Sequence, residues 1–297
     1  MTYGTALRRF ALNHMTVPGL GMPELFGLAS TLGIKEVEIR NDLSEEGRPG
    51  KGDIRTVSAG QARRLAEDAG VTIISINALQ RFNEWTPARA AEAVELADYA
   101  QASGARALVL VPVNDGTGQA DGERQRNLRE ALKALKPILA ERGLVGLVEP
   151  LGFEICSLRS KREASEAMAE IGGGDVFRLV HDTFHHALAG EDTFFPGLTG
   201  LVHISGVADP ARSHAQMLDA HRGLVDEKDR LGNADQIRIL LDGGYRGPLS
   251  FEAFAREVHD LQAPGQEIAA SMAFIGAAVD RMTGRTQGCD GVARAFQ

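Results

Sequence analysis

The sequence predicts one α/β domain in which eight parallel strands close into a (β/α)8 barrel. Short apolar runs alternate with longer amphipathic stretches along the whole chain, and this alternation is typical of βα units around a parallel sheet. Eight such runs are present, which is the number that a closed barrel of this kind needs. The length of 297 residues fits one barrel of about 250 residues with extensions.

The eight apolar runs are the predicted strands. Several of them are continuously apolar rather than alternating, as expected for strands that helices cover from outside. They span Arg9–Asn13, Glu36–Arg40, Thr72–Asn77, Ala107–Pro112, Gly146–Glu149, Phe177–Asp182, Leu201–Ser205 and Pro248–Glu252.

Helix signals lie between the strands. Thr86 is expected to cap a helix that begins at Pro87, because proline is tolerated where its missing N–H had no partner. The following helix carries a stripe of leucines, and Pro137 should kink it or remove one of its hydrogen bonds. Gly143 supplies a left-handed end for that helix.

No linker rich in proline, glycine or serine divides the chain. We therefore expect a single domain over residues 1–297, with the barrel at about 9–284 and an irregular tail at 285–297. The least regular stretches inside the barrel are Asn41–Asp53 and Val207–Asn233, and both follow strands. Such loops lie on the C-terminal face of a barrel, where active sites are built.

Composition and charge exclude several classes of partner. The formal net charge is -8 and no run of lysine and arginine exceeds two residues, so we expect no nucleic-acid partner. The longest nearly apolar run, Ala105–Val113, is far shorter than the ~20 residues that span a bilayer. Met1–Phe10 lacks the apolar core of a signal peptide. We expect a cytoplasmic protein without a membrane partner, and Cys156 and Cys289 as reduced thiols.

Four successive predicted strands end in side chains that bind metals: Glu149, Asp182, His203 and Glu252. Consecutive strands are neighbours around a barrel, so these C-terminal ends converge at one part of its mouth. Carboxylates gathered there would repel one another without a cation. We therefore predict one bound divalent metal ion, and the mixed oxygen and nitrogen donors suit Mn, Mg, Co or Zn.

Each of these residues also has an ordinary structural interpretation when taken alone. A glutamate at a strand end is often a salt-bridge partner, and a histidine after two apolar residues is often a hydrogen-bonded core group. Four such residues at four successive strand ends favour the metal site. His185 follows Asp182 by three residues and would face the same side of a helix. It is either a substrate-binding group or a helix cap, and adjacent His186 leaves both interpretations open.

At these residues the chain resembles the xylose-isomerase-like TIM barrel superfamily of sugar isomerases, epimerases and endonucleases of the endonuclease IV type. The resemblance covers about residues 10–280, and Glu149, the Asp182-x-x-His185 pair, His203 and Glu252 match the metal-site pattern of that family. Within it the chain looks most like the inosose isomerases, also called 2-keto-myo-inositol isomerases. The stretches behind this closer similarity are Leu12–Thr16, Glu38–Asp42, Leu110–Asp115, Glu149–Phe153 and Asp229–Asn233.

Endonucleases of this superfamily hold additional zinc ions. They use extra histidines on the third and fourth strands and an Asp-x-His motif after the seventh. Here those strands end in Asn77 and Asn114, and Lys228, not histidine, follows Asp226 by two residues. The comparison of motifs therefore implies a single metal ion and sets DNA repair aside.

The resemblance implies a reaction that moves a carbonyl group between adjacent carbons of a keto-polyol, or inverts the carbon beside it. The metal would chelate the carbonyl and a neighbouring hydroxyl oxygen and stabilise a cis-enediolate. Glu149 and Glu252 would remove and return the proton while also binding metal. His185 would polarise a substrate oxygen or steady the enediolate.

Five further residues are expected to contact substrate. Arg40, Asn77 and Asn114 end strands at positions where hydroxyl groups would be read, although capping of the following loops explains them equally well. Glu154 and Arg222 lie in loops where related epimerases use a glutamate and an arginine on substrate, with different spacing here.

The expected substrate is a small molecule, 2-keto-myo-inositol, and the lack of a clear cationic phosphate clamp favours an unphosphorylated polyol. A ketose 3-epimerase, a hydroxypyruvate isomerase and an inosose dehydratase stay open as alternatives on the same site. A metal-free sugar-binding barrel is the alternative from a different class. A homo-oligomer is compatible with the sequence.

Overall fold

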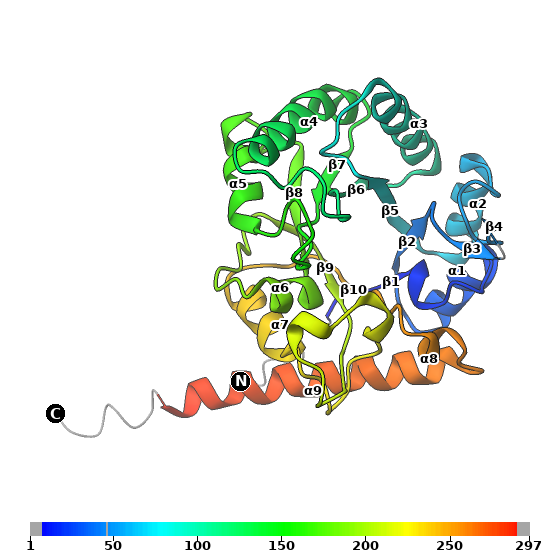
Figure 1. The fold of residues 1–297 in the computed structure, drawn as a ribbon. Helices are drawn as coiled ribbons and strands as arrows, with labels where there is room; N and C mark the ends of the chain where they lie inside the picture. Colours follow the sequence, from blue (N-terminus) through cyan, green and yellow to red (C-terminus); the bar gives the residue numbers. More distant parts are fainter. Residues whose placement is uncertain (1–7, 46, 290–297) are drawn as a thin grey trace.

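The structure is a computed structural model that describes residues 8–45 and 47–289. Eight parallel strands form a closed barrel in the order β1-β10-β9-β8-β7-β6-β5-β2 (Figure 1). This confirms the predicted fold class and all eight predicted strands. The barrel strands are β1 Phe10–Asn13, β2 Glu36–Arg40, β5 Thr72–Gln80, β6 Ala107–Val111, β7 Val145–Val148, β8 Phe177–Asp182, β9 Thr199–Ile204 and β10 Leu249–Phe251.

Helices surround the barrel as an outer layer (Figure 1). A two-stranded hairpin, β3 Ser44–Glu45 with β4 Arg48–Pro49, lies in the loop after β2. Short 3-10 turns occur at His14–Thr16, His214–Gln216 and Asp219–His221. The helices are α1 Met22–Thr31, α2 Ala59–Ala69, α3 Pro87–Ser103, α4 Glu123–Ala140, α5 Lys161–Glu170, α6 Thr183–Ala189, α7 Asn233–Asp242, α8 Arg256–His259 and α9 Pro264–Cys289.

Local sequence signals explain where several helices begin. Thr86 caps α3 by accepting a hydrogen bond from the backbone N–H of Arg89, and Pro87 is the first helical residue, as the sequence predicts. Pro137 lies inside α4, and Gly143 has a left-handed φ of 65° just beyond it. The C-terminal prediction needs a correction, because α9 continues to Cys289 where an irregular tail was expected from residue 285. Residues 290–297 of that expected tail lie outside the described residues.

The barrel interior is apolar at one end and polar at the other. Ala107 and Val109 of β6, Leu147 of β7, Val180 of β8 and Leu201 of β9 belong to one apolar cluster. Their sequence neighbours such as Leu108 and Leu179 belong to the larger cluster with helix residues, so the first set faces inward because strand side chains alternate. Side chains two residues further along these strands therefore also face inward, at the C-terminal end.

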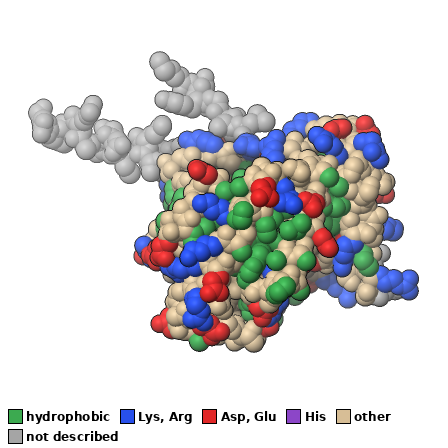
Figure 2. Space-filling view, turned by 90° about the horizontal axis from the view of Figure 1, so that it is seen from above, with side chains coloured by type: hydrophobic (Ala, Val, Ile, Leu, Met, Phe, Trp, Pro, Cys, Tyr) green, Lys and Arg blue, Asp and Glu red, His purple; other side chains and the backbone are tan. Residues whose placement is uncertain are grey.

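The outer surface carries charges of both signs. On the face seen in Figure 2, basic and acidic side chains are intermingled and apolar side chains lie between them. No helix among the described residues is long and apolar enough to cross a membrane.

Candidate metal centre and substrate pocket

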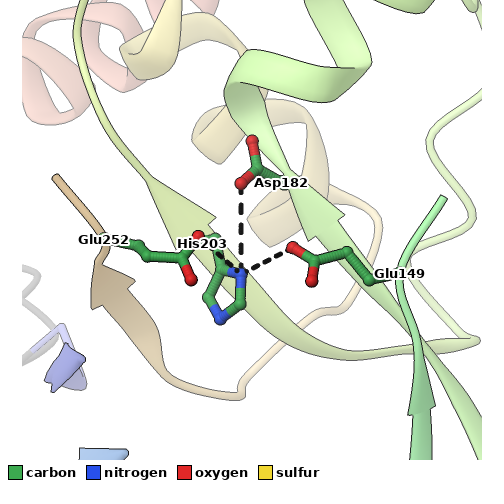
Figure 3. Close-up of side chains that lie close together, drawn as sticks. All are labelled: Glu149, Asp182, His203 and Glu252. Carbon is green, nitrogen blue, oxygen red and sulfur yellow. Dashed lines mark hydrogen bonds and ion pairs between the residues drawn. The ribbon is translucent and has the colours of Figure 1, made fainter. Parts of the chain in front are cut away.

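The alternation of the strands brings the four predicted metal ligands together. Glu149 stands two residues after the inward-facing Leu147, and the same spacing relates Asp182 to Val180 and His203 to Leu201. Glu252 follows directly after β10. The four side chains come from four neighbouring strands and point toward one another (Figure 3).

The cluster is compact and buried. One donor atom from each of the four residues lies within 4.8 Å of the others. Nδ1 of His203 is 2.8 Å from Oε1 of Glu149, 3.3 Å from Oε2 of Glu252 and 4.0 Å from Oδ2 of Asp182. Asp182 uses its other oxygen, Oδ1, to accept hydrogen bonds from two backbone N–H groups at the start of α6. Its Oδ2 therefore stays directed at the cluster.

The electrostatics of the cluster fit a cation. Burial disfavours the charged form of His203, but the carboxylates of Glu252, Glu38 and Glu149 outweigh it and raise its pKa well above the usual range. Burial raises the pKa of Glu252 to about 7, against the opposing influence of His203 and Arg222. Without a metal ion, the negative charge of the carboxylates therefore favours a protonated, positively charged His203. Three carboxylates and one imidazole are also a suitable donor set for a divalent metal ion.

Two buried arginines hold Glu252 from both sides. Nη2 of Arg222 lies 2.6 Å from Oδ2 of Asp182 and 2.9 Å from Oε2 of Glu252. Nη1 of Arg40 lies 2.8 Å from Oε1 of Glu252, while its Nε and Nη2 form a two-point ion pair with Asp42, each at 2.7 Å. Each oxygen of Glu252 therefore has its own guanidinium partner, which fixes the carboxylate plane.

A pocket of about 320 Å³ opens above the cluster. Glu149 and Glu252 line it, so two of the four predicted ligands are directly accessible to a substrate. His185 also lines it, and its buried Nδ1 has no hydrogen-bond partner among the described residues. Burial lowers the pKa of His185, which keeps the imidazole neutral. An unpartnered ring nitrogen of a neutral imidazole can serve as donor or acceptor for a substrate hydroxyl group.

The residues expected to read substrate hydroxyl groups fall into three groups. Asn114 lines the pocket, and its buried Oδ1 has no hydrogen-bond partner in the part of the chain that the structure describes. Arg40, Asn77 and Arg222 line it as well, but their donors contact other protein groups: Arg40 and Arg222 hold carboxylates, and Asn77 donates to Glu38 at 2.7 Å. Glu154 has an exposed side chain and is not among the lining residues.

Sequence reasoning missed five charged residues of the site. Asp42, Arg81, Asp115 and Asp219 line the pocket, and they come from loops and turns whose conformation has no periodic signal. Glu38 lies beneath His203, at 3.1 Å from its Nε2. A signal for Glu38 was available, because a charged residue between Val37 and Ile39 in an apolar strand needs a buried partner.

Comparisons with known proteins identify the fold and the family of the chain. A protein-family model described as xylose isomerase-like TIM barrel matches residues 26–278. No curated protein matches the chain. A solved xylose isomerase domain-containing protein from Salmonella typhimurium is 35% identical, with 91% of this chain and 97% of that chain covered and a TM-score of 0.81.

Two more distant structures share the fold. The IolI protein with a bound zinc atom is 19% identical, with 92% of this chain and 98% of that chain covered and a TM-score of 0.77. A D-allulose 3-epimerase from Methylomonas sp., in complex with D-allulose, is 18% identical, with 94% and 97% covered and a TM-score of 0.66. The family model and the relative that is 35% identical each cover most of the chain, and the chain therefore belongs to the xylose isomerase-like TIM barrel family.

Proposed function

We propose that this protein is a metal-dependent isomerase of a small unphosphorylated keto-polyol, with 2-keto-myo-inositol as the first candidate substrate. The observation that carries the proposal is that Glu149 and Glu252 belong to the four-residue donor cluster and also line the pocket. They would bind the metal ion together with Asp182 and His203. When bound, a divalent ion would supply a Lewis acid that polarises a substrate carbonyl and offsets the charge left by proton removal.

The residues of the chain would move the proton. Glu149 and Glu252 lie on opposite ends of the four-strand arc and face one pocket, so they can approach two adjacent carbons of a substrate between them. One carboxylate would take a proton from the carbon beside the carbonyl, and the other would give a proton to the former carbonyl carbon. The hydroxyl proton of the first carbon would pass to the former carbonyl oxygen, so that the carbonyl moves by one carbon.

The charges around the pocket support a neutral substrate. Each lining arginine already has a carboxylate partner: Arg40 pairs with Asp42, Arg81 with Asp115 and Arg222 with Asp219. A phosphate group would have to compete with these carboxylates for the guanidinium groups. Hydroxyl groups, in contrast, match the unpartnered atoms of His185 and Asn114.

Deuterium exchange tests the proposal directly. Protein loaded with Mn or Zn is incubated in D2O with inososes and unphosphorylated ketoses, and products are followed by NMR. We expect deuterium at a carbon beside the carbonyl of at least one compound. A panel without exchange would refute the isomerase proposal and leave the metal-free sugar-binding barrel as the better explanation.

Variants test the assigned roles. Glu149→Gln and Glu252→Gln should each reduce exchange by about 100-fold or more, because each removes a proton-transfer group. Glu154→Gln is the matched control, since this glutamate follows the same strand as Glu149 but has an exposed side chain outside the pocket. It should exchange at the rate of the unmodified protein. Activity retained in either of the first two variants would contradict the role of that residue.

A 3-epimerase is the second candidate, and the fold shared with the D-allulose 3-epimerase supports it. Both reactions remove a proton beside a carbonyl, so exchange alone does not separate them. The product does: an isomerase moves the carbonyl to the next carbon, whereas an epimerase inverts one centre and leaves the carbonyl in place. A hydroxypyruvate isomerase would act on a three-carbon compound, and an inosose dehydratase would release water.

A further inference from the structure

Glu38 is a fully buried carboxylate on the far side of His203 from the proposed ion. The two ring nitrogens of His203 face different partners. Nδ1 faces Glu149 and Glu252 in the donor cluster, while Nε2 lies 3.1 Å and 3.3 Å from the two oxygens of Glu38. Glu38 itself stands on β2, outside the four strands that supply the cluster.

Among residues 8–45 and 47–289, every other hydrogen bond of Glu38 comes from a donor. Asn77 donates at 2.7 Å and Asn13 at 3.3 Å, and the hydroxyl groups of Ser75 and Ser250 donate as well. These residues belong to β1, β5 and β10, so three strands besides its own hold the carboxylate in place. A carboxyl group surrounded only by donors is in its ionised form, which accepts hydrogen bonds and donates none.

This arrangement decides where the proton of a neutral His203 resides. With the proton on Nε2, the ring donates to Glu38 and presents the Nδ1 lone pair to the cluster. With the proton on Nδ1, the Nε2 lone pair would face an ionised carboxylate, and N–H would face the ion. We infer that Glu38 is a positioning residue that fixes His203 in the Nε2-protonated form, so that Nδ1 is free to bind the metal. The inference rests on the metal site of the proposed function, and it assigns a role to a residue that does not touch the ion.

Zinc affinity tests the inference without any substrate. Glu38→Gln keeps the shape of the side chain. Its NH2 group, however, replaces an oxygen that accepts hydrogen bonds in the unmodified protein, so that one donor would face another. We expect zinc affinity, measured by competition with a chromophoric chelator, to fall by about 10- to 100-fold, as is typical when the outer partner of a metal-binding histidine is removed. Glu38→Gln with the zinc affinity of the unmodified protein would overturn the inference.

Glu36→Gln is the matched control. Glu36 lies two residues earlier on the same strand and is also buried, but it pairs with Arg9 at the other end of the barrel. Its zinc affinity should stay within about two-fold of the unmodified protein. An equal loss in both variants would mean that burial of any glutamate on β2 matters, and would overturn the specific role of Glu38.

A measurement on the unmodified protein covers the case in which Glu38→Gln does not fold. In NMR spectra of zinc-loaded protein with 15N-labelled histidine, His203 should show a protonated Nε2 and a zinc-shifted Nδ1; the reverse pattern would overturn the inference.

The zinc-affinity and NMR results do not depend on catalysis. A protein that binds zinc in this way but exchanges no deuterium with any substrate would refute the proposed function and leave the role of Glu38 intact.

Discussion

Lys161 is a buried lysine whose pKa depends on the groups around it, although it does not line the pocket. Its Nζ lies 2.8 Å from Nδ1 of His181 and 2.8 Å from Nδ1 of His186, and 5.5 Å from the centre of the Phe194 ring. Only 3% of the residue is exposed. Burial lowers the pKa of Lys161 to about 7, although the more distant Glu191 and Asp182 oppose the shift. Arg222 is also buried, but it contacts carboxylates directly, and these stabilise its positive charge. The Nζ of Lys161 has no carboxylate of the described residues in hydrogen-bond contact, so burial destabilises its charged form.

The titration of Lys161 predicts a pH dependence of stability. Between pH 7 and the ordinary pKa of 10.5, the unfolded chain binds a proton at this residue that the folded chain does not. The free energy of unfolding therefore rises with pH in this window, by up to roughly 1.4 kcal/mol per unit from this group, and it does not change below pH 7 on its account. Lys161→Met should remove this contribution. Urea unfolding of both proteins at several pH values from 7 to 9.5 checks it, and parallel curves would contradict the assignment.

At the scale of elements, strands could be predicted well and loops could not. Glu149, Asp182 and His203 stand at or near the C-terminal ends of β7, β8 and β9. Because the ends of neighbouring parallel strands converge at the mouth of a barrel, their positions at the strand ends were enough to group them, as the structure does. Arg222 and Asp219 lie in the long loop after β9, where hydrogen bonds and packing set the conformation. Spacing to a strand end therefore could not show which of Glu154 and Arg222 enters the pocket.

The loop after β7 also shows how tightly one element constrains another. A Cβ atom on Gly152 would lie 2.3 Å from the carbonyl oxygen of His185 and 2.6 Å from Cβ of Leu188. The loop that follows Glu149 thus packs directly on α6, which carries His185. Only a residue without a side chain allows this approach.

We expect Gly152→Ala to separate the two elements. The substitution should lower the free energy of unfolding by about 1–3 kcal/mol, as is typical of overpacking, and it should reduce substrate turnover because His185 shifts. Gly174→Ala is the control, since a Cβ there meets nothing within 4 Å and the residue is exposed. Its stability should change by less than about 0.5 kcal/mol. Urea denaturation measures both, and similar values for the two variants would contradict the packing argument.

At the scale of the whole molecule, closure of the barrel brings the residues of the site together. The four donors span residues 149 to 252 of the chain and meet only when β7, β8, β9 and β10 are neighbours in the closed sheet. The unfolded chain therefore has no comparable site. Closure also places Glu38, from a strand across the barrel, against the same histidine. A ligand that binds the folded state alone must stabilise it by mass action.

Metal addition should therefore raise the melting temperature. At a free ion concentration of 100 times Kd, the folded state gains about 2.7 kcal/mol, which corresponds to an increase of about 4 °C for a chain of this size. Differential scanning calorimetry with Mn, Zn, Co and Mg measures the shift and ranks the ions, and a chelator should reverse it.

His203→Ala should show no shift with any of them, because the one nitrogen donor of the cluster is lost, whereas Glu36→Gln should shift as the unmodified protein does. If none of the four ions moves the melting temperature of the unmodified protein, the cluster is not a metal site, and the protonated His203, the two arginines and neighbouring hydrogen-bond donors hold the buried carboxylates.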